Sequence, residues 1–273
     1  MAQEKTIVTD YPENGWLRGY FTTNESDILG GHQGATSFWK NTDFLRLRDT
    51  ALHVLNPQPG QTILDVGCSD GATMIYCGLQ GAEVYGQDLN PESVAGANKL
   101  LNRFNLKGEA VCGDAVELKF PDNHFDGVIS SDFFEHITDD IKVKVLREIS
   151  RVLKPGKPIV IKTPNLSYLK IALLYKRLRA VSRLRNPFKI VIPHTPGTDD
   201  PQHVGLVSRW QLTQCLYQAG FGNFHFFYAP LKRFGTSRFM EAISTEIPIL
   251  RDKFCEDVFC IALKPIALAH FPD

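Results

Sequence analysis

The sequence lacks an excess of charge of either sign. Thirty Lys and Arg side chains balance thirty Asp and Glu, so no global field draws the chain to nucleic acid. It also lacks a C-x-x-C pair, and its six cysteines stand mostly within apolar runs. This arrangement favours reduced, buried thiols over disulfides or a zinc site.

Long apolar runs are missing as well. No run approaches ~18 residues, and no charged-then-apolar leader opens the chain. We therefore expect a cytoplasmic protein. Neither an internal repeat nor a low-complexity tract is visible, and 273 residues of ordinary composition are enough for one domain with insertions.

What is present is a regular alternation of strand and helix patterns between residues 61 and 164. The predicted strands are Thr62 to Val66, Ala82 to Asp88, Glu109 to Asp114, Phe125 to Ser131 and Lys157 to Thr163. Helices are predicted between them, at about residues 72–79, 90–104 and 138–156. This rhythm is typical of a parallel sheet with crossover helices, whose strands are buried on both faces.

After Pro164 the rhythm stops for about forty residues and resumes with a helix at 208–219 and strands at 223–228 and 258–263. The sequence predicts an α/β, Rossmann-like fold with a mostly parallel seven-stranded sheet and helices on both faces. We expect one domain made of four segments: a helical N-terminal cap or lid (1–50), a cofactor-binding core (61–164), an insertion after the fifth strand (165–207) and the C-terminal part of the sheet (208–273).

The stretch "ILDVGCSDGAT" ends a buried strand on a carboxylate and a glycine-rich turn. In a doubly wound sheet, ligands bind beyond the carboxyl ends of the strands. Gly67 and Gly71 do not fit the G-x-G-x-x-G spacing of dinucleotide loops. Asp65, two residues before the first glycine, would repel a pyrophosphate and suits an amine-bearing or cationic ligand. A nicotinamide oxidoreductase is therefore disfavoured.

Asp88 comes 21 residues after Gly67, at the end of the second strand. An acid at this place can accept hydrogen bonds from both hydroxyls of a ribose. The ligand then carries a ribose and a positive amine but no phosphates, a description that S-adenosylmethionine meets. Taken one by one, the acids have structural alternatives: Asp65 as a turn cap, Asp88 as a cap for the helix at Asn90, and Asp114 as a turn residue.

The motifs "ILDVGCSDG", "GQDLNPES", "GDA", "FDGVISSDFFEHI" and "LREISRVLKPGKPIVIKTPN" occur in that order. Together they resemble the class I S-adenosylmethionine-dependent methyltransferases, closely over about residues 61–165 and loosely beyond. One departure is Ser69, where many members have glycine; only a local adjustment is expected.

The resemblance implies roles for the matching positions. It implies that Asp65, Gly67 and Gly71 frame the methionine portion, that Asp88 holds the ribose, and that Asp114 and Ala115 lie at the adenine. Ser131 and Asp132 would lie near the methionine end and the acceptor. The resemblance extends donor contacts to three further residues: Cys68, Ser69 and Leu89.

Methylation of a hydroxyl needs a base, and histidine suits that task at neutral pH. His136, which follows the fourth strand, is the first candidate, although "EHI" also fits a simple helix start. His203 is the second. A metal site can be imagined from Asp199, Asp200 and His203, but no second constellation supports it, so no metal is predicted.

The sequence thus predicts O-methylation of a small or lipid-like metabolite, as in secondary metabolism. N- or C-methylation of a small or glycosylated acceptor remains an alternative, and a non-catalytic nucleoside-binding protein is a further one. Nucleic acid is disfavoured as acceptor, because no N-P-P-Y-like or D-P-P-Y-like tetrapeptide follows the fourth strand.

Residues 165–192 carry seven basic side chains and no acid, with leucines mostly at helical spacing. An amphipathic basic helix can lie on an anionic membrane, cover a binding site or simply face solvent. A similar insertion occurs at this place in ubiquinone-biosynthesis-type O-methyltransferases, by position and character rather than by sequence. The segment makes peripheral membrane or lipid contact one expectation, and an anionic acceptor another. The sequence does not predict the oligomeric state.

Overall fold

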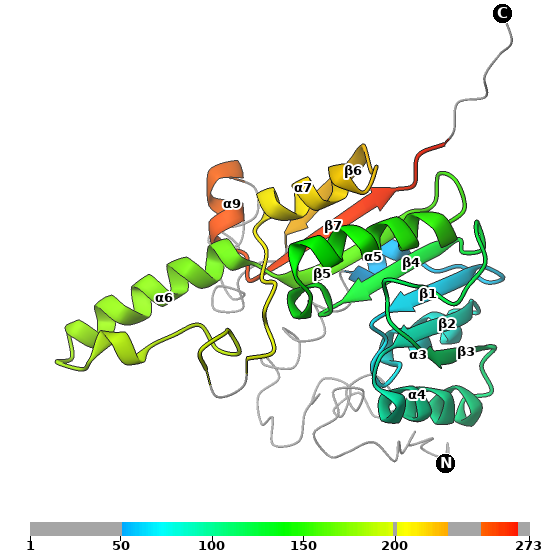
Figure 1. Cartoon of the computed structure of the whole chain (residues 1–273), viewed down its shortest axis with the longest axis horizontal. Coiled ribbons are helices and arrows are strands. Elements are labelled where there is room, and N and C mark those ends of the chain that lie inside the picture. The colour runs from blue at the N-terminus through cyan, green and yellow to red at the C-terminus, as the bar shows by residue number, and fades with distance from the viewer. Residues whose placement is uncertain (1–50, 199–200, 229–246, 267–273) are drawn as a thin grey trace, which may run out of the picture.

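The computed structural model describes residues 51–198, 201–228 and 247–266. Their apolar runs form a seven-stranded sheet with the order β3-β2-β1-β4-β5-β7-β6 (Figure 1). The strands are β1 (Thr62–Val66), β2 (Glu83–Asp88), β3 (Gly108–Cys112), β4 (Gly127–Ser131), β5 (Pro158–Pro164), β6 (Asn223–Tyr228) and β7 (Asp257–Leu263). Strand β7 pairs antiparallel with β5 and β6, and the other pairs are parallel, in line with the mostly parallel sheet that the sequence predicted.

Helices cover both faces of this sheet because its strands alternate apolar side chains between the faces. Ile63 belongs to the core shared with α3 and α4, whereas Leu64 belongs to the core shared with α5 and α7. These helices are α3 (Ala72–Leu79), α4 (Pro91–Arg103), α5 (Asp139–Val152) and α7 (Arg209–Gln218). The doubly wound architecture is confirmed.

Local sequence signals set the helix starts. The Asn90 side chain accepts hydrogen bonds from the N–H groups of Glu92 and Ser93, with Pro91 at the first helical position of α4, as expected. Ser208 and Gln211 form a reciprocal capping box at the start of α7. The short helix α9 (Pro248–Phe254) was not predicted from the sequence.

An arm leaves the sheet after β5. It begins with α6 (Leu166–Val181) and returns through η3 (Pro187–Lys189). We call residues 166–206 the arm; Figure 1 shows α6 pointing away from the sheet. Its base is closed by a parallel bridge between Asn165 and Val207, which brings the returning chain back to the end of β5.

The predicted N-terminal cap, residues 1–50, lies outside the described residues. Residues 51–55 are helical, and Ala51 and Leu52 are buried against the face of the sheet that α3 and α4 cover. Within the described ranges, none of the helices combines the length and apolar character that crossing a membrane needs.

Candidate functional site

Three acidic residues lie at or just beyond the carboxyl ends of neighbouring strands, at one edge of the sheet. Asp65 lies in β1, Asp88 ends β2, and Asp114 comes shortly after β3. Because β3, β2 and β1 are parallel neighbours, their carboxyl ends meet at this edge. The structure therefore brings together the three acids that the sequence assigned to one ligand.

The turn after β1 has the backbone that its glycines allow. Gly67 and Gly71 have φ values of 76° and 82°, and Ser69 has 44°, so the serine takes up the left-handed conformation that a glycine adopts more easily. A Cβ on Gly67 would lie 2.5 Å from the ring of Phe133. The turn is thus in direct contact with the segment that follows β4.

Asp88 is hydrogen-bonded within the protein by both carboxylate oxygens. Its Oδ2 accepts the backbone N–H of Ser69 at 2.9 Å, and its Oδ1 accepts that of Asn90 at 2.9 Å. Asp88 therefore does brace the start of the helix at Asn90, as the structural alternative for this residue stated. A carboxylate offers about four acceptor sites, so capacity is left for the two hydroxyls of a ribose.

Asp114 also has a structural partner, since its Oδ1 accepts the N–H of Val116 at 3.1 Å, as in a turn. Its side chain is exposed, and Ala115 beside it is buried. Leu89 next to Asp88 is 71% exposed. An exposed leucine beside an acid at this edge offers an apolar surface next to a hydrogen-bond acceptor.

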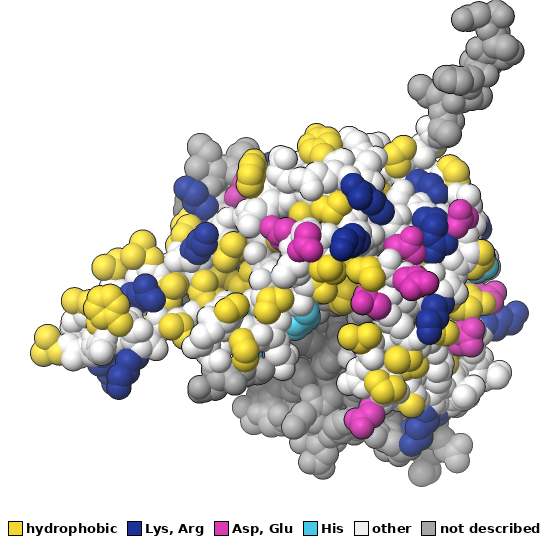
Figure 2. Space-filling model, viewed as in Figure 1, with side chains coloured by type: hydrophobic (Ala, Val, Ile, Leu, Met, Phe, Trp, Pro, Cys, Tyr) yellow, Lys and Arg dark blue, Asp and Glu magenta, His cyan; other side chains and the backbone are white. Residues whose placement is uncertain are grey.

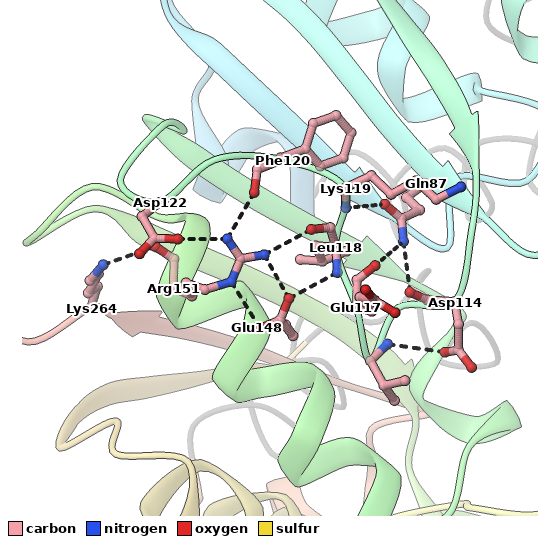
Figure 3. A network of polar contacts seen from close by, with 11 residues as sticks. Gln87, Asp114, Glu117, Leu118, Lys119, Phe120, Asp122, Glu148, Arg151 and Lys264 are labelled. Atoms are coloured by element: carbon pink, nitrogen blue, oxygen red, sulfur yellow. Dashed lines mark hydrogen bonds and ion pairs between the residues drawn. The ribbon is translucent and has the colours of Figure 1, made fainter.

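The loop from Asp114 to Phe120 is held by two side chains whose role the sequence did not reveal (Figure 3). Gln87 in β2 donates through Nε2 to the carbonyl oxygens of Asp114 at 2.7 Å and Glu117 at 3.1 Å. Arg151 in α5 donates to the carbonyls of Leu118 and Phe120 at 2.8 and 2.9 Å. Both residues act on the backbone of the loop, and they fix the segment that carries Asp114.

Cys68 differs from its neighbours in the turn. Its side chain is buried, and a Cβ on Gly86 would lie 2.7 Å from its Sγ. Burial raises the pKa of the thiol above its usual value, with Asp65 and Asp88 adding to the rise. Cys68 is therefore a neutral core thiol at the base of the turn.

A group of charged side chains lies near the carboxyl ends of the next two strands, β4 and β5. Asp132, just after Ser131 at the end of β4, has a φ of 55°, an uncommon conformation for aspartate. Both its carboxylate oxygens bind Lys162 Nζ, at 2.5 and 2.7 Å. Lys162 Nζ also lies 3.8 Å from Asp257 Oδ2. Burial lowers the pKa of Lys162, but the two aspartates outweigh it and hold the pKa above its usual value.

Glu135 lies in the turn η2 (Phe134–His136) and is 2% exposed. Its Oε2 accepts a hydrogen bond from the hydroxyl of Thr163 at 3.0 Å. Burial raises the pKa of Glu135 to about 7, and Asp132 adds to this rise, while Lys162 and Thr163 act against it. The buried carboxyl was not among the site residues that the sequence indicated.

The two candidate histidines meet beside this carboxyl. The rings of His136 and His203 are 5.1 Å apart, centre to centre, in an edge-on contact, and His194 is 5.2 Å from His203. His136 Nδ1 lies 3.1 Å from the carbonyl oxygen of Gln202. The two histidines, distant in the sequence, therefore form one cluster near the ends of β4 and β5. Asp199 and Asp200 lie outside the described residues.

Comparison with known proteins agrees with this geometry. Residues 64–161 match a family model described as a methyltransferase domain. The match spans the turn after β1, all three acids and strand β4. Residues 64–161 are thus similar to a methyltransferase domain. The fold is that of the class I S-adenosylmethionine-dependent methyltransferases, as the resemblance implied.

The curated proteins to which this chain is similar are named for methyl transfer to different atoms. Norajmaline N-methyltransferase of Rauvolfia serpentina is 32% identical over 59% of this chain and 59% of its own length. A probable chloroplastic tocopherol O-methyltransferase of Oryza sativa subsp. japonica is 36% identical over 53% of this chain and 40% of its own length. The chain thus spans between two fifths and three fifths of these relatives.

A solved structure of similar fold covers more of this chain. It is that of an S-adenosylmethionine-dependent methyltransferase from Archaeoglobus fulgidus, with a TM-score of 0.57 and 22% identity over 83% of this chain and 96% of that one. This likeness extends the shared fold beyond residues 64–161.

Proposed function

We propose that the chain is an S-adenosylmethionine-dependent methyltransferase that methylates an oxygen of a small or lipid-like metabolite. One observation supports S-adenosylmethionine as the donor. Asp65, Asp88 and Asp114 lie at the carboxyl ends of three adjacent parallel strands, within the residues that match a methyltransferase domain. An amine, two ribose hydroxyls and an adenine amino group are all hydrogen-bond donors, and carboxylates accept from each.

The acceptor is proposed to bind where β4 and β5 end. Gly67 in the donor turn touches Phe133, so this region adjoins the methionine end of the proposed donor. Ser131 and Asp132 lie in the same region. The methyl group passes from the sulfonium to the acceptor oxygen, a neutral thioether leaves, and the hydroxyl proton goes to a base. Alignment of the reacting atoms supplies much of the rate.

His136 and His203 are the proposed groups that act on this hydroxyl. The carbonyl of Gln202 can only accept, so the hydrogen bond at 3.1 Å assigns the proton of His136 to Nδ1. Nε2 then keeps a lone pair for a proton or another electrophile. This arrangement favours an oxygen acceptor over N- or C-methylation, which needs no such base when the nucleophile is already unprotonated.

The test has two stages. Isothermal titration of the full chain with S-adenosylmethionine should show binding, and its absence contradicts the donor assignment. A panel of lipidic phenols, cyclic amines, sterols and glycosylated compounds is then incubated with methyl-labelled donor and scored by mass spectrometry. Label on oxygen supports the proposal. Label on nitrogen or carbon identifies an N- or C-methyltransferase, and donor binding without transfer to any compound supports a nucleoside-binding protein.

We also propose that the arm contacts an anionic membrane surface. On α6, Leu174, Leu178 and Val181 recur at helical spacing and are 59%, 62% and 56% exposed. Beyond the helix, Leu184 and Phe188 are 99% and 80% exposed. Figure 2 shows apolar and basic side chains together on this protruding part.

Charge supports the same partner, because residues 165–192 carry seven basic side chains and no acid. Sedimentation with phosphatidylglycerol vesicles should retain the chain, and neutral phosphatidylcholine vesicles should retain it less. Leu184→Ser with Phe188→Ser should release it, while Leu79→Ser, at an exposed leucine on α3, should not. Equal behaviour of both variants contradicts membrane contact through the arm.

A further inference from the structure

The cluster near the ends of β4 and β5 has the composition of a metal site. One ligand atom from each of Glu135, His136 and His203 can be chosen so that all three lie within 4.8 Å of one another. Bonds of about 2.0–2.2 Å place neighbouring ligands of a tetrahedral ion about 3.3–3.6 Å apart. The widest separation within the set is therefore at most about 1.5 Å longer than an ion needs, a gap that metal binding would close by rotating the side chains.

We propose that Glu135, His136 and His203 bind one divalent transition-metal ion of the zinc type. Two imidazoles and a carboxylate suit such ions better than Mg²⁺, which prefers oxygen ligands in an octahedron. Three protein ligands leave at least one position open, as in catalytic rather than structural zinc sites.

The hydrogen bond to His136 supports this proposal. Histidines that bind metals usually donate their other ring N–H to a carbonyl or a carboxylate, which fixes the tautomer and the orientation of the ring. Here Nδ1 lies 3.1 Å from the carbonyl oxygen of Gln202. That contact keeps the proton on Nδ1 and the lone pair on Nε2, as metal binding requires.

The cluster adjoins a charged group. Lys162 Nζ pairs with Asp132 and Asp257 at the ends of β4 and β5, and Thr163, the next residue of β5, binds Glu135. Lys142, in the neighbouring helix α5, is paired with Asp139 and the carbonyl of Ile137.

The backbone holds the two histidine segments together without help from a ligand. Gly205 N–H donates to the carbonyl oxygen of Glu135 at 2.9 Å. A Cβ on Gly205 would lie 1.7 Å from the carbonyl oxygen of Ile137, so the two segments approach too closely for any side chain there. His203 N–H also donates to the carbonyl of His194 at 2.6 Å. The ligands are therefore preorganised on two adjoining backbones.

If the proposed function holds, the open coordination position of the ion could bind the methyl acceptor. A bound acceptor hydroxyl on the ion would lose its proton more readily, and the histidines would then act through the ion rather than as bases. This use rests on the proposed methyl transfer, whereas metal binding does not. The site is consequently tested by binding alone, and donor binding is measured separately.

The full chain is stripped with a chelator, dialysed, and titrated with Zn²⁺ by calorimetry and with Co²⁺ by visible absorption. We expect one ion per chain and a cobalt spectrum without a thiolate charge-transfer band. His136→Ala, His203→Ala and Glu135→Gln should each weaken binding by at least ~10–100-fold. His225→Ala, at a histidine on β6, should leave it unchanged.

Circular dichroism of each variant shows whether it is folded, and only folded variants are compared. The conservative His136→Gln variant serves if His136→Ala fails to fold. Absence of binding in the stripped wild type overturns the proposal. The proposal is also overturned if both histidine variants bind the ion as tightly as the wild type. A cobalt spectrum with thiolate bands overturns it too, because it would show that cysteines bind the ion.

Discussion

The Oδ2 atom of Asp88 accepts a hydrogen bond from the backbone N–H of Ser69 at 2.9 Å, which ties the end of β2 to the turn after β1. One carboxylate thus shapes the turn and is proposed to hold the ribose. Asp88→Ala should weaken S-adenosylmethionine binding by about 1–3 kcal/mol, because ribose hydroxyls lose their acceptor. Calorimetric titration measures this change.

Asp88→Asn keeps one acceptor oxygen for the N–H of Ser69 but loses the charge and the oxygen that accepts the N–H of Asn90. It should bind the donor more weakly than wild type, and it should melt below the wild type but above Asp88→Ala, which loses both backbone contacts. Asp140→Ala, at an exposed acid on α5, is the control and should bind normally. Unchanged donor affinity in both Asp88 variants contradicts the ribose assignment.

Glu148 provides a test of stability against pH. Its hydrogen bond to Arg151 holds the pKa of this carboxyl below its usual value. A carboxylate of lowered pKa stabilises the fold above its unfolded pKa, and this stabilisation is lost as the pH falls through the folded value. Glu148→Gln should therefore lower the free energy of unfolding by about 1 kcal/mol at pH 7, a small value because solvent screens the pair.

Denaturant unfolding of wild type and Glu148→Gln is compared at pH 7 and after acidification through the pKa of the folded carboxyl. The difference should shrink at the lower pH, where the wild-type carboxyl is protonated too. Glu109→Gln, at an exposed glutamate on β3, should show no comparable difference at either pH. A difference that grows on acidification would contradict a lowered pKa for Glu148 in the folded protein.

Gly205 is predicted to hold the histidine cluster together. Gly205→Ala should push its loop away from the turn at Ile137 and weaken Zn²⁺ binding by ~10-fold or more, although no ligand is removed. Gly222→Ala is the matched control, because a Cβ there meets nothing within 4 Å. If both variants bind Zn²⁺ as the wild type does, the close backbone approach does not set the site.

A variant of His136, together with chelator treatment, distinguishes direct proton transfer to His136 from assistance by a bound metal ion. His136→Ala should slow methyl transfer by roughly 10²–10⁴-fold in either case. Chelator treatment of the wild type should stop transfer, and Zn²⁺ should restore it, if the ion acts on the acceptor. Transfer that is insensitive to the chelator, together with a slow His136→Ala variant, would assign the proton to His136 itself.

Much of the fold followed from the sequence because local rules agree there. The run Thr62–Val66, the helix Ala72–Leu79 and the cap at Asn90 were all predicted at their observed positions. Each depends on neighbours in the chain: apolar runs, a following glycine, or an Asn-Pro start. The short helix α9 begins with Pro248 but has no side-chain cap at its start, and it was missed.

The positions of Asp65 and Asp88 at the carboxyl edge of the sheet were predictable, because each follows from where a strand ends. The tertiary partners were not. Lys162 within "KPIVIKTP" gave a signal, since a charged residue in a buried strand needs an opposite charge, but the sequence could not name Asp132 and Asp257 as its partners. Glu135 was visible beside His136, yet its burial depends on β5.

The antiparallel strand β7 has a consequence for how the chain is made. It lies between β5 and β6 in the sheet but follows both in the sequence. On the ribosome, the donor half can therefore assemble early, whereas β5 exposes an open edge until residues 257–263 emerge. Released chains truncated before Asp257 should for that reason depend on chaperones far more than released chains that include β7.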